Sequence, residues 1–115
     1  MYFGNWKNRE EMISEFVSYR AEDGTRKSAF DGAEILIASY VTGSWEGDGY
    51  VLMRKEGQLL ELEGGHCSCY GMEDVWPPQA TTVEALKKRK VPMWRDEDED
   101  VRKFQAAWKD LVSAL

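Results

Sequence analysis

The chain has 115 residues, of which 43% are hydrophobic and 31% charged, a balance typical of one globular domain with a buried core. We therefore expect a single domain over residues 1–115. Fifteen basic and twenty-one acidic side chains give a formal net charge of −6, which disfavours direct binding to nucleic acids and anionic membranes. The sequence has neither a membrane-spanning apolar stretch nor the apolar core of a secretory signal, so we expect a cytoplasmic protein.

The first predicted element is a helix from about residue 9 to residue 19. Asn8 is a candidate N-cap, because its side-chain oxygen can accept from the free backbone N–H groups of a first turn. Apolar residues recur at helical spacing, which predicts that one side of this helix lies on a core; they are Met12, Ile13, Phe16 and Val17. The polar residues 20–32 that follow, with Gly24 and Gly32, are typical of a connection.

Three strands are predicted in the middle of the chain, at residues 34–41, 50–55 and 58–63. The first has apolar residues on both alternating faces, as expected of a well-covered strand. Glu56-Gly57 predicts a tight hairpin turn between the second and third. In the third strand Leu60 and Leu62 alternate with Glu61 and Glu63, which predicts one apolar and one solvated face. The three strands together form an antiparallel meander.

Two further segments are predicted to be irregular. Residues 42–49 contain three glycines around Trp45, which favours a loop with one large aromatic available for contacts. Residues 64–71 are followed by Trp76-Pro77-Pro78, which cannot continue a helix interior or a central strand.

The last part of the chain predicts two helices, at about residues 83–89 and 98–114. Thr81 or Thr82 is the candidate N-cap of the first, and Pro92 follows it. The second has the clearest amphipathic pattern of the sequence, with apolar residues three and four apart: Val101, Phe104, Trp108, Leu111, Val112 and Leu115. An acidic run, residues 96–100, occupies its start. We expect an α+β fold in which an antiparallel meander of at least three strands has the N-terminal and C-terminal helices packed on one face.

The only histidine and the only two cysteines, His66, Cys67 and Cys69, lie within four positions. A disulfide between Cys67 and Cys69 would close almost no chain, so reduced thiols are expected. Histidine and cysteine are zinc ligands, so one hypothesis is a zinc site. A tetrahedral site would need a fourth donor, such as Glu73, Asp74, water or a second subunit. A second hypothesis is that Cys67 or Cys69 is a nucleophile activated by His66. The third is structural, with small packing cysteines and a histidine that bonds the backbone.

The middle of the chain resembles small proteins encoded by bacteriophages, prophages and their bacterial hosts. The resemblance is carried by residues 35–40, by Trp45-Glu46-Gly47 with Tyr50-Val51-Leu52 and, chiefly, by the G-x-H-C-S-C-Y-G pattern of residues 64–71, followed by Glu73, Trp76-Pro77-Pro78 and residues 82–86. It implies a biological setting and no activity, cofactor or mechanism.

The leading functional hypothesis is a non-enzymatic protein-binding module, of the kind that phages use to modulate or inhibit host proteins, including defence proteins. Exposed aromatics among glycines and acids are suitable interface anchors. The expected contact residues are Trp45, Glu46, His66, Cys67, Cys69, Tyr70, Glu73 and Trp76. The acidic residues 96–100 would favour a basic partner. No cofactor is expected under this hypothesis. The alternative is a small zinc-binding or thiol-dependent enzyme centred on His66, Cys67 and Cys69.

Overall fold

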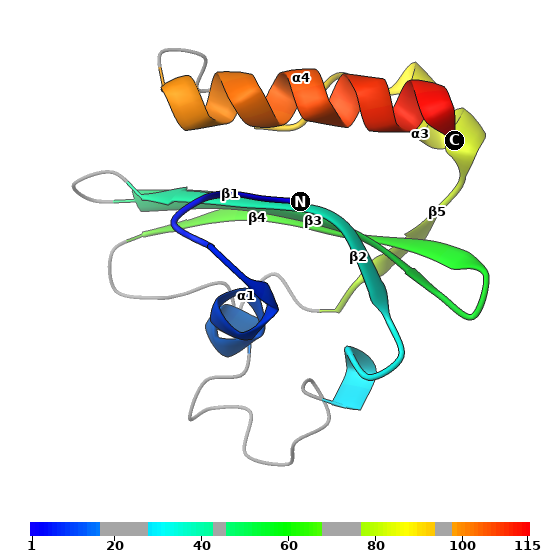
Figure 1. The fold of residues 1–115 in the computed structure, drawn as a ribbon, viewed down its shortest axis with the longest axis horizontal. Helices are drawn as coiled ribbons and strands as arrows, with labels where there is room; N and C mark the ends of the chain where they lie inside the picture. Colours follow the sequence, from blue (N-terminus) through cyan, green and yellow to red (C-terminus); the bar gives the residue numbers. More distant parts are fainter. Residues whose placement is uncertain (17–27, 43–45, 68–76, 94–97) are drawn as a thin grey trace.

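The computed structural model describes residues 1–16, 28–42, 46–67, 77–93 and 98–115. The elements are, in chain order, β1 (Tyr2–Gly4), α1 (Arg9–Phe16), β2 (Glu34–Thr42), β3 (Glu46–Lys55), β4 (Gln58–Cys67), β5 (Gln79–Thr81), α3 (Val83–Lys88) and α4 (Glu99–Ala114). Figure 1 shows the sheet nearly edge-on, with α4 above it and α1 below it. Among the described residues, no helix is both long enough and apolar enough to span a lipid bilayer.

The five strands form one sheet in the order β1-β2-β3-β4-β5. Strands β2 to β5 are antiparallel neighbours, so the predicted meander of at least three strands is confirmed. Strand β1 pairs with β2 in parallel, which makes the sheet mixed. The fold is therefore α+β with a mostly antiparallel sheet.

The β3–β4 hairpin turns at the predicted residues. Glu56 and Gly57 both have positive φ, 52° and 79°, and Lys55 faces Gln58 in the strand register. Two consecutive residues in the left-handed region are typical of a type I′ turn, whose twist matches that of the strands on either side. The turn thereby fixes the register of the two longest strands.

Both hairpin strands extend further than the sequence predicted. Strand β3 begins at Glu46 and β4 continues to Cys67, with Gly49 facing Gly64 and Gly47 facing His66. The predicted loop at residues 46–49 and the predicted irregular segment at residues 64–67 are therefore wrong. Glycine weakens a strand only modestly, and here each glycine-rich segment finds its backbone hydrogen-bond partners in the other strand.

The helices α1 and α4 lie on opposite faces of the sheet, not on one face as predicted. Apolar side chains alternate along the central strands and divide into two clusters. The strand residues in the cluster with α1 are Ala38, Tyr40, Val51, Met53 and Leu62. Those in the cluster with α4 are Ile37, Val41, Tyr50, Leu52 and Leu59. Successive strand residues point to opposite faces, so a strand that is apolar on both faces requires a cover on each.

The α1 face is packed mainly by aromatic side chains. Trp6 contacts Tyr40 and Phe16 at centroid distances of 5.0 and 5.8 Å, and Phe16 contacts Phe30 at 5.7 Å. The predicted cap is confirmed, since Asn8 Oδ1 accepts from the backbone N–H of Glu11 at 2.9 Å. The chain reaches this face by a sharp turn at Gly4, where φ is +71° and a Cβ would lie 2.1 Å from the Tyr40 carbonyl oxygen. Only glycine fits there.

The α4 face is packed by the amphipathic helix that the sequence predicted. Its buried residues lie three or four positions apart and are Val101, Phe104, Trp108 and Val112. Phe104 contacts Tyr50 and Phe3 at centroid distances of 5.7 and 6.0 Å. Asp98 caps the helix, its Oδ1 accepting from the backbone N–H groups of Asp100 and Val101 at 2.8 and 3.2 Å.

Candidate functional site

Three of the predicted contact residues lie at one end of the β3–β4 pair. Glu46 is opposite Cys67, and Gly47 is opposite His66 in the antiparallel register. On the other side of β3, Gly47 faces Thr42, the last residue of β2. We call the end formed by Thr42, Glu46 and Cys67 the loop end of the sheet. The other predicted contact residues, Trp45, Cys69, Tyr70, Glu73 and Trp76, lie outside the described residues.

The segments that the sequence singled out all adjoin this loop end. Residues 43–45 connect Thr42 to Glu46, and residues 68–76 follow Cys67 directly. Figure 1 shows the start of α4, which follows the acidic residues 96 and 97, above the same end of the sheet. Residues 43–45 and 68–76 are far apart in sequence, but the described residues to which they are joined, Glu46 and Cys67, lie side by side.

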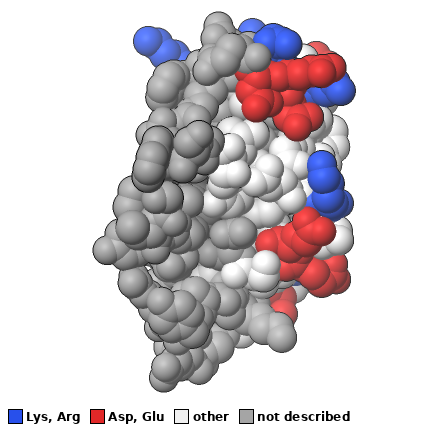
Figure 2. All heavy atoms as spheres, turned by 90° about the vertical axis from the view of Figure 1, so that its left-hand side faces the viewer, with Lys and Arg blue, Asp and Glu red and all other residues white. Residues whose placement is uncertain are grey.

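This end of the molecule carries acidic groups. Figure 2 faces it and shows acidic side chains in separate groups, with uncharged residues between them and basic side chains at their edges. The first turn of α1 holds Glu10 and Glu11, and that of α4 holds Glu99 and Asp100, all four of them exposed. Carboxylates at a helix N-terminus are favoured by the helix dipole, so these positions are also stable places for negative charge.

The candidate metal ligands are only partly placed. His66 and Cys67 are consecutive residues of β4, while Cys69 lies outside the described residues. Within the described part of the chain, no three His, Cys, Asp or Glu residues are grouped closely enough to hold a metal ion.

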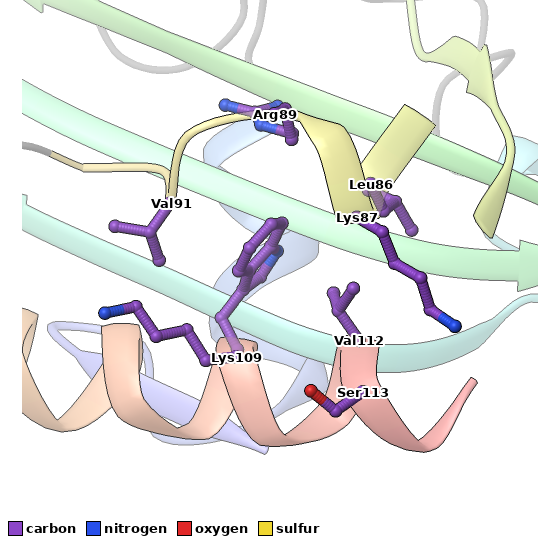
Figure 3. Close-up of a pocket in the computed structure, with 8 residues that line it drawn as sticks. Leu86, Lys87, Arg89, Val91, Lys109, Val112 and Ser113 are labelled. Atoms are coloured by element: carbon purple, nitrogen blue, oxygen red, sulfur yellow. The ribbon is translucent and has the colours of Figure 1, made fainter. Parts of the chain in front are cut away.

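A pocket of about 340 Å³ lies between α3 and α4 (Figure 3). Its apolar lining consists of Leu86, Val91, Trp108 and Val112, and its polar lining of Lys87, Arg89, Lys109 and Ser113. The predicted threonine cap explains why α3 starts where it does, because Thr82 Oγ1 accepts from the backbone N–H of Ala85 at 3.1 Å. The sequence did not predict this pocket, because it requires α3 and α4 to be neighbours.

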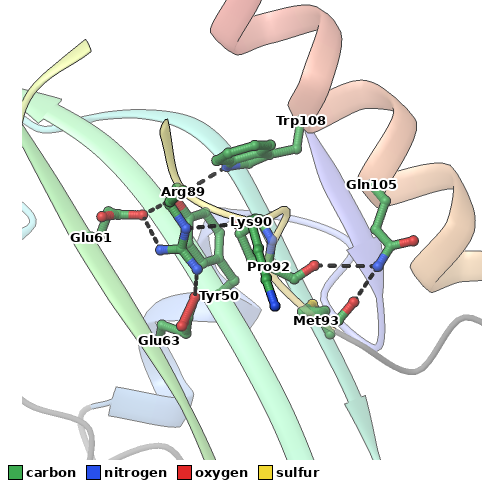
Figure 4. Close-up of polar contacts among 9 residues, drawn as sticks. All are labelled: Tyr50, Glu61, Glu63, Arg89, Lys90, Pro92, Met93, Gln105 and Trp108. Carbon is green, nitrogen blue, oxygen red and sulfur yellow. Dashed lines mark hydrogen bonds and ion pairs between the residues drawn. The ribbon is translucent and has the colours of Figure 1, made fainter. Parts of the chain in front are cut away.

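Beside the pocket, a polar network joins the sheet to the two C-terminal helices (Figure 4). The Tyr50 hydroxyl donates to Glu61 Oε2 and accepts from Trp108 Nε1–H at 3.2 Å. Arg89 donates to Glu61 at 2.8 Å and to Glu63 at 2.5 Å. Its guanidinium carbon also lies 5.6 Å from the Tyr50 ring centroid and 5.9 Å from that of Trp108. Such distances allow cation–π attraction in addition to the ion pairs.

The network corrects the predicted solvated face of β4. The side chain of Glu61 is only 14% exposed, because α3 and Arg89 cover it, whereas Glu63 is 43% exposed. The two glutamates share a strand face, two residues apart, and one arginine reaches both. The sequence shows that Glu61 and Glu63 share a strand face, but it did not indicate that Arg89 is their partner.

The protonation states of the network follow from burial and charge. Burial raises the pKa of Tyr50, and the hydrogen bond to Glu61 raises it further, so the phenol stays neutral and donates its proton. Burial acts to lower the pKa of Arg89, but the hydrogen bond to Glu63 and the charges of Glu63 and Glu61 outweigh it and raise the pKa overall. The network therefore fixes α3 to β4 and α4, and its arginine is already neutralised.

Comparison with known protein-family models, with curated proteins and with solved structures finds no match to this chain.

Proposed function

We propose that the protein is a non-enzymatic protein-binding module that contacts its partner through the loop end of the sheet. The supporting observation is that the segments with the expected anchors adjoin Thr42, Glu46 and Cys67, with the start of α4 at the same end. A single surface with contributions from several segments is how interface patches are usually built on a rigid scaffold.

The residue types at this end suit such a surface. The sequence places Trp45 directly before Glu46 and Tyr70 three residues after Cys67, and large aromatics carry most of the binding energy in interfaces. The exposed carboxylates of Glu99 and Asp100 at the start of α4 would complement a basic partner and speed its approach. A basic protein is therefore the proposed partner.

The resemblance to phage and prophage proteins suggests where to find this partner. A phage-type modulator acts on host proteins, including those of host defence, so the partner is sought among bacterial proteins. This part of the proposal rests on the resemblance alone.

The proposal is tested by affinity capture from a bacterial lysate at low salt, with the immobilised full chain. We expect at least one protein above the level of an unrelated acidic control, and less of it with Trp45→Ala. If the intact chain retains nothing above that control, the binding-module proposal fails. If capture is unchanged by Trp45→Ala in a folded variant, Trp45 is not an anchor.

The contribution of charge is tested with two matched double variants. Glu99→Gln with Asp100→Asn removes two charges at the start of α4, and Glu84→Gln with Asp110→Asn removes two exposed charges elsewhere. Because complementary charge mainly accelerates association, the first pair should weaken capture at low salt and the second should not. Equal losses in both variants would assign the effect to net charge instead of to this end.

The second candidate function, a zinc or thiol site, rests on the strand register that places Glu46 opposite Cys67. Carboxylate and thiolate are both zinc ligands. Elemental analysis of protein purified without added metal separates the two candidates. Stoichiometric zinc that is lost in Cys67→Ser with Cys69→Ser would support the metal site, and metal-free protein that still captures a partner would support the binding module.

A further inference from the structure

We propose that the pocket between α3 and α4 binds a small amphipathic carboxylate, with its apolar body against Trp108 and Val112 and its carboxylate at the rim, where Lys87 or Lys109 can reach it. The site is separate from the loop end of the sheet and does not depend on the proposed protein-binding function.

The size of the pocket sets the size of the ligand. Its volume of about 340 Å³ is near the lower limit of ~300 Å³ that is usual for small-molecule sites. It corresponds to about eleven water-sized volumes of ~30 Å³ each. A compact molecule fits within this volume.

The apolar lining requires an apolar body in the ligand. Leu86, Trp108 and Val112 are almost fully buried and form the floor, and Val91 is half-buried at one wall. Figure 3 shows Val91 and Val112 directed into the space between α3 and α4. Water at the apolar lining that stays accessible, chiefly at Val91, is displaced favourably by an apolar group.

The charges around the pocket select an anion. Figure 3 shows Lys109 and Lys87 extending to opposite sides of Val112. Both are exposed, and within the described residues neither has an ion pair or a hydrogen bond. Arg89 also lines the pocket, but Glu61 and Glu63 already occupy its guanidinium. The two lysines are therefore the cations that remain for a ligand.

A small anion suits this pocket better than an acidic protein does. The chain as a whole carries a net charge of −6, so a large acidic partner would be repelled by most of the surface. A small carboxylate experiences chiefly the two nearby lysines, because charges beyond about 8–10 Å are screened at physiological salt.

The test uses octanoate as the probe and 1-octanol as its neutral counterpart, followed in ¹H–¹⁵N correlation spectra of the full chain. Octanoate should shift amides of residues 86–91 and 108–113 saturably, with a dissociation constant on the order of 1 mM, as expected for so small a ligand. Octanol should bind more weakly. An absence of saturable shifts at these residues, or equal binding of octanol, would overturn the proposal.

Two double variants of equal charge locate the anion. Lys87→Gln with Lys109→Gln removes the pocket cations, and Lys88→Gln with Lys103→Gln removes two exposed lysines that do not line the pocket. Octanoate affinity should fall about fivefold or more in the first variant and stay within about twofold in the second, in line with the strength of exposed ion pairs. Equal effects would refute the role of the two lysines. Tighter binding of a Glu-Leu-Glu peptide than of octanoate would identify a protein segment as the occupant and contradict the small-molecule proposal.

Discussion

The two faces of the sheet are covered in different ways. On one face, most of the buried side chains of the cover come from α4, a single helix of 16 residues whose backbone hydrogen bonds are internal, and Leu86 of α3 and Met93 add to it. On the other face, the cover combines the eight-residue α1 with separate pieces of chain that carry Trp6 and Phe30. The second arrangement leaves backbone carbonyl groups that need donors from elsewhere.

Basic side chains supply these donors on the α1 face. Arg9 donates to the carbonyl oxygens of Phe30 and of Ala33, the latter at 2.9 Å. Lys55 donates to Ala29 and Lys7 to Gly4, both at 2.8 Å. In the α1 layer, polar contacts therefore fasten short pieces of chain to one another, whereas in the α4 layer they fasten α3 and α4 to the sheet around a core supplied mainly by one helix.

The largest expected effect is the loss of a packed ring from the α4 layer. Trp108→Ala should lower the free energy of unfolding by about 3–5 kcal/mol, because Trp108 is only 3% exposed and packs on Tyr50. Urea denaturation measures the loss. Trp108→Phe keeps an apolar ring and should cost about half as much or less. Equal costs for the two variants would show that the N–H···O bond, and not packing, holds this layer.

On the α1 face, the sensitive contact is polar. Arg9→Met should lower the free energy of unfolding by about 2–3 kcal/mol, because two part-buried carbonyl groups lose a charged donor. Arg54→Met is the control, since Arg54 is 41% exposed and only forms a 3.6 Å ion pair with the exposed Glu34. That variant should stay within about 0.5 kcal/mol of the unmodified protein. If Arg9→Met lowered the free energy of unfolding by no more than about 0.5 kcal/mol, the hydrogen bonds of Arg9 would not stabilise the α1 face.

An intermediate effect is expected at Tyr50, and it depends on pH. The pKa of Tyr50 is raised in the folded state, so above pH ~10 the unfolded chain releases this proton while the folded chain retains it. The folded protein should therefore lose stability as the pH rises through this range, by at most about 1.4 kcal/mol per pH unit from this group. Tyr50→Phe should cost about 1–2 kcal/mol at pH 7, from the lost hydrogen bonds.

Denaturation at pH 9 to 11 compares the two proteins, and the other tyrosines cancel in the difference. The unmodified protein should lose its advantage over Tyr50→Phe as the pH rises. A constant difference across this range would mean that Tyr50 ionises alike in the folded and unfolded states.

The smallest effect is a gain. Ser39 is fully buried on the α4 side of β2, and its hydroxyl has no hydrogen-bond partner among the described residues. Ser39→Ala removes this unsatisfied group and should raise the free energy of unfolding by about 1 kcal/mol in urea denaturation. A loss of stability would show that the hydroxyl is bonded in solution.

Features of the fold that depend on local signals could be predicted from the sequence. The caps at Asn8 and Thr82, the Glu56-Gly57 turn and the amphipathic pattern of α4 each involve residues a few positions apart. The three-residue strands β1 and β5 were missed, because strands so short exist only through their pairing with β2 and β4. The extra length of β3 and β4 was missed for the same reason.

The arrangement of the site depended on contacts that are distant in sequence. The helix faces were predicted wrongly although β2 is apolar on both sides, which already indicated a cover on each face. Glu61 was expected in solvent, since its partner Arg89 is 28 residues away in sequence. The contact residues themselves were proposed from composition, and the sheet register is what brings Glu46 beside Cys67.

A double-mutant cycle tests most directly whether the sheet has two separately packed faces. Phe16→Leu removes part of the α1 cluster and Phe104→Leu part of the α4 cluster, each at a cost of about 1–1.5 kcal/mol. Because the two rings lie on opposite faces, their effects on the free energy of unfolding should add within about 0.5 kcal/mol. A coupling energy above about 1 kcal/mol would contradict this account and place both rings in one core.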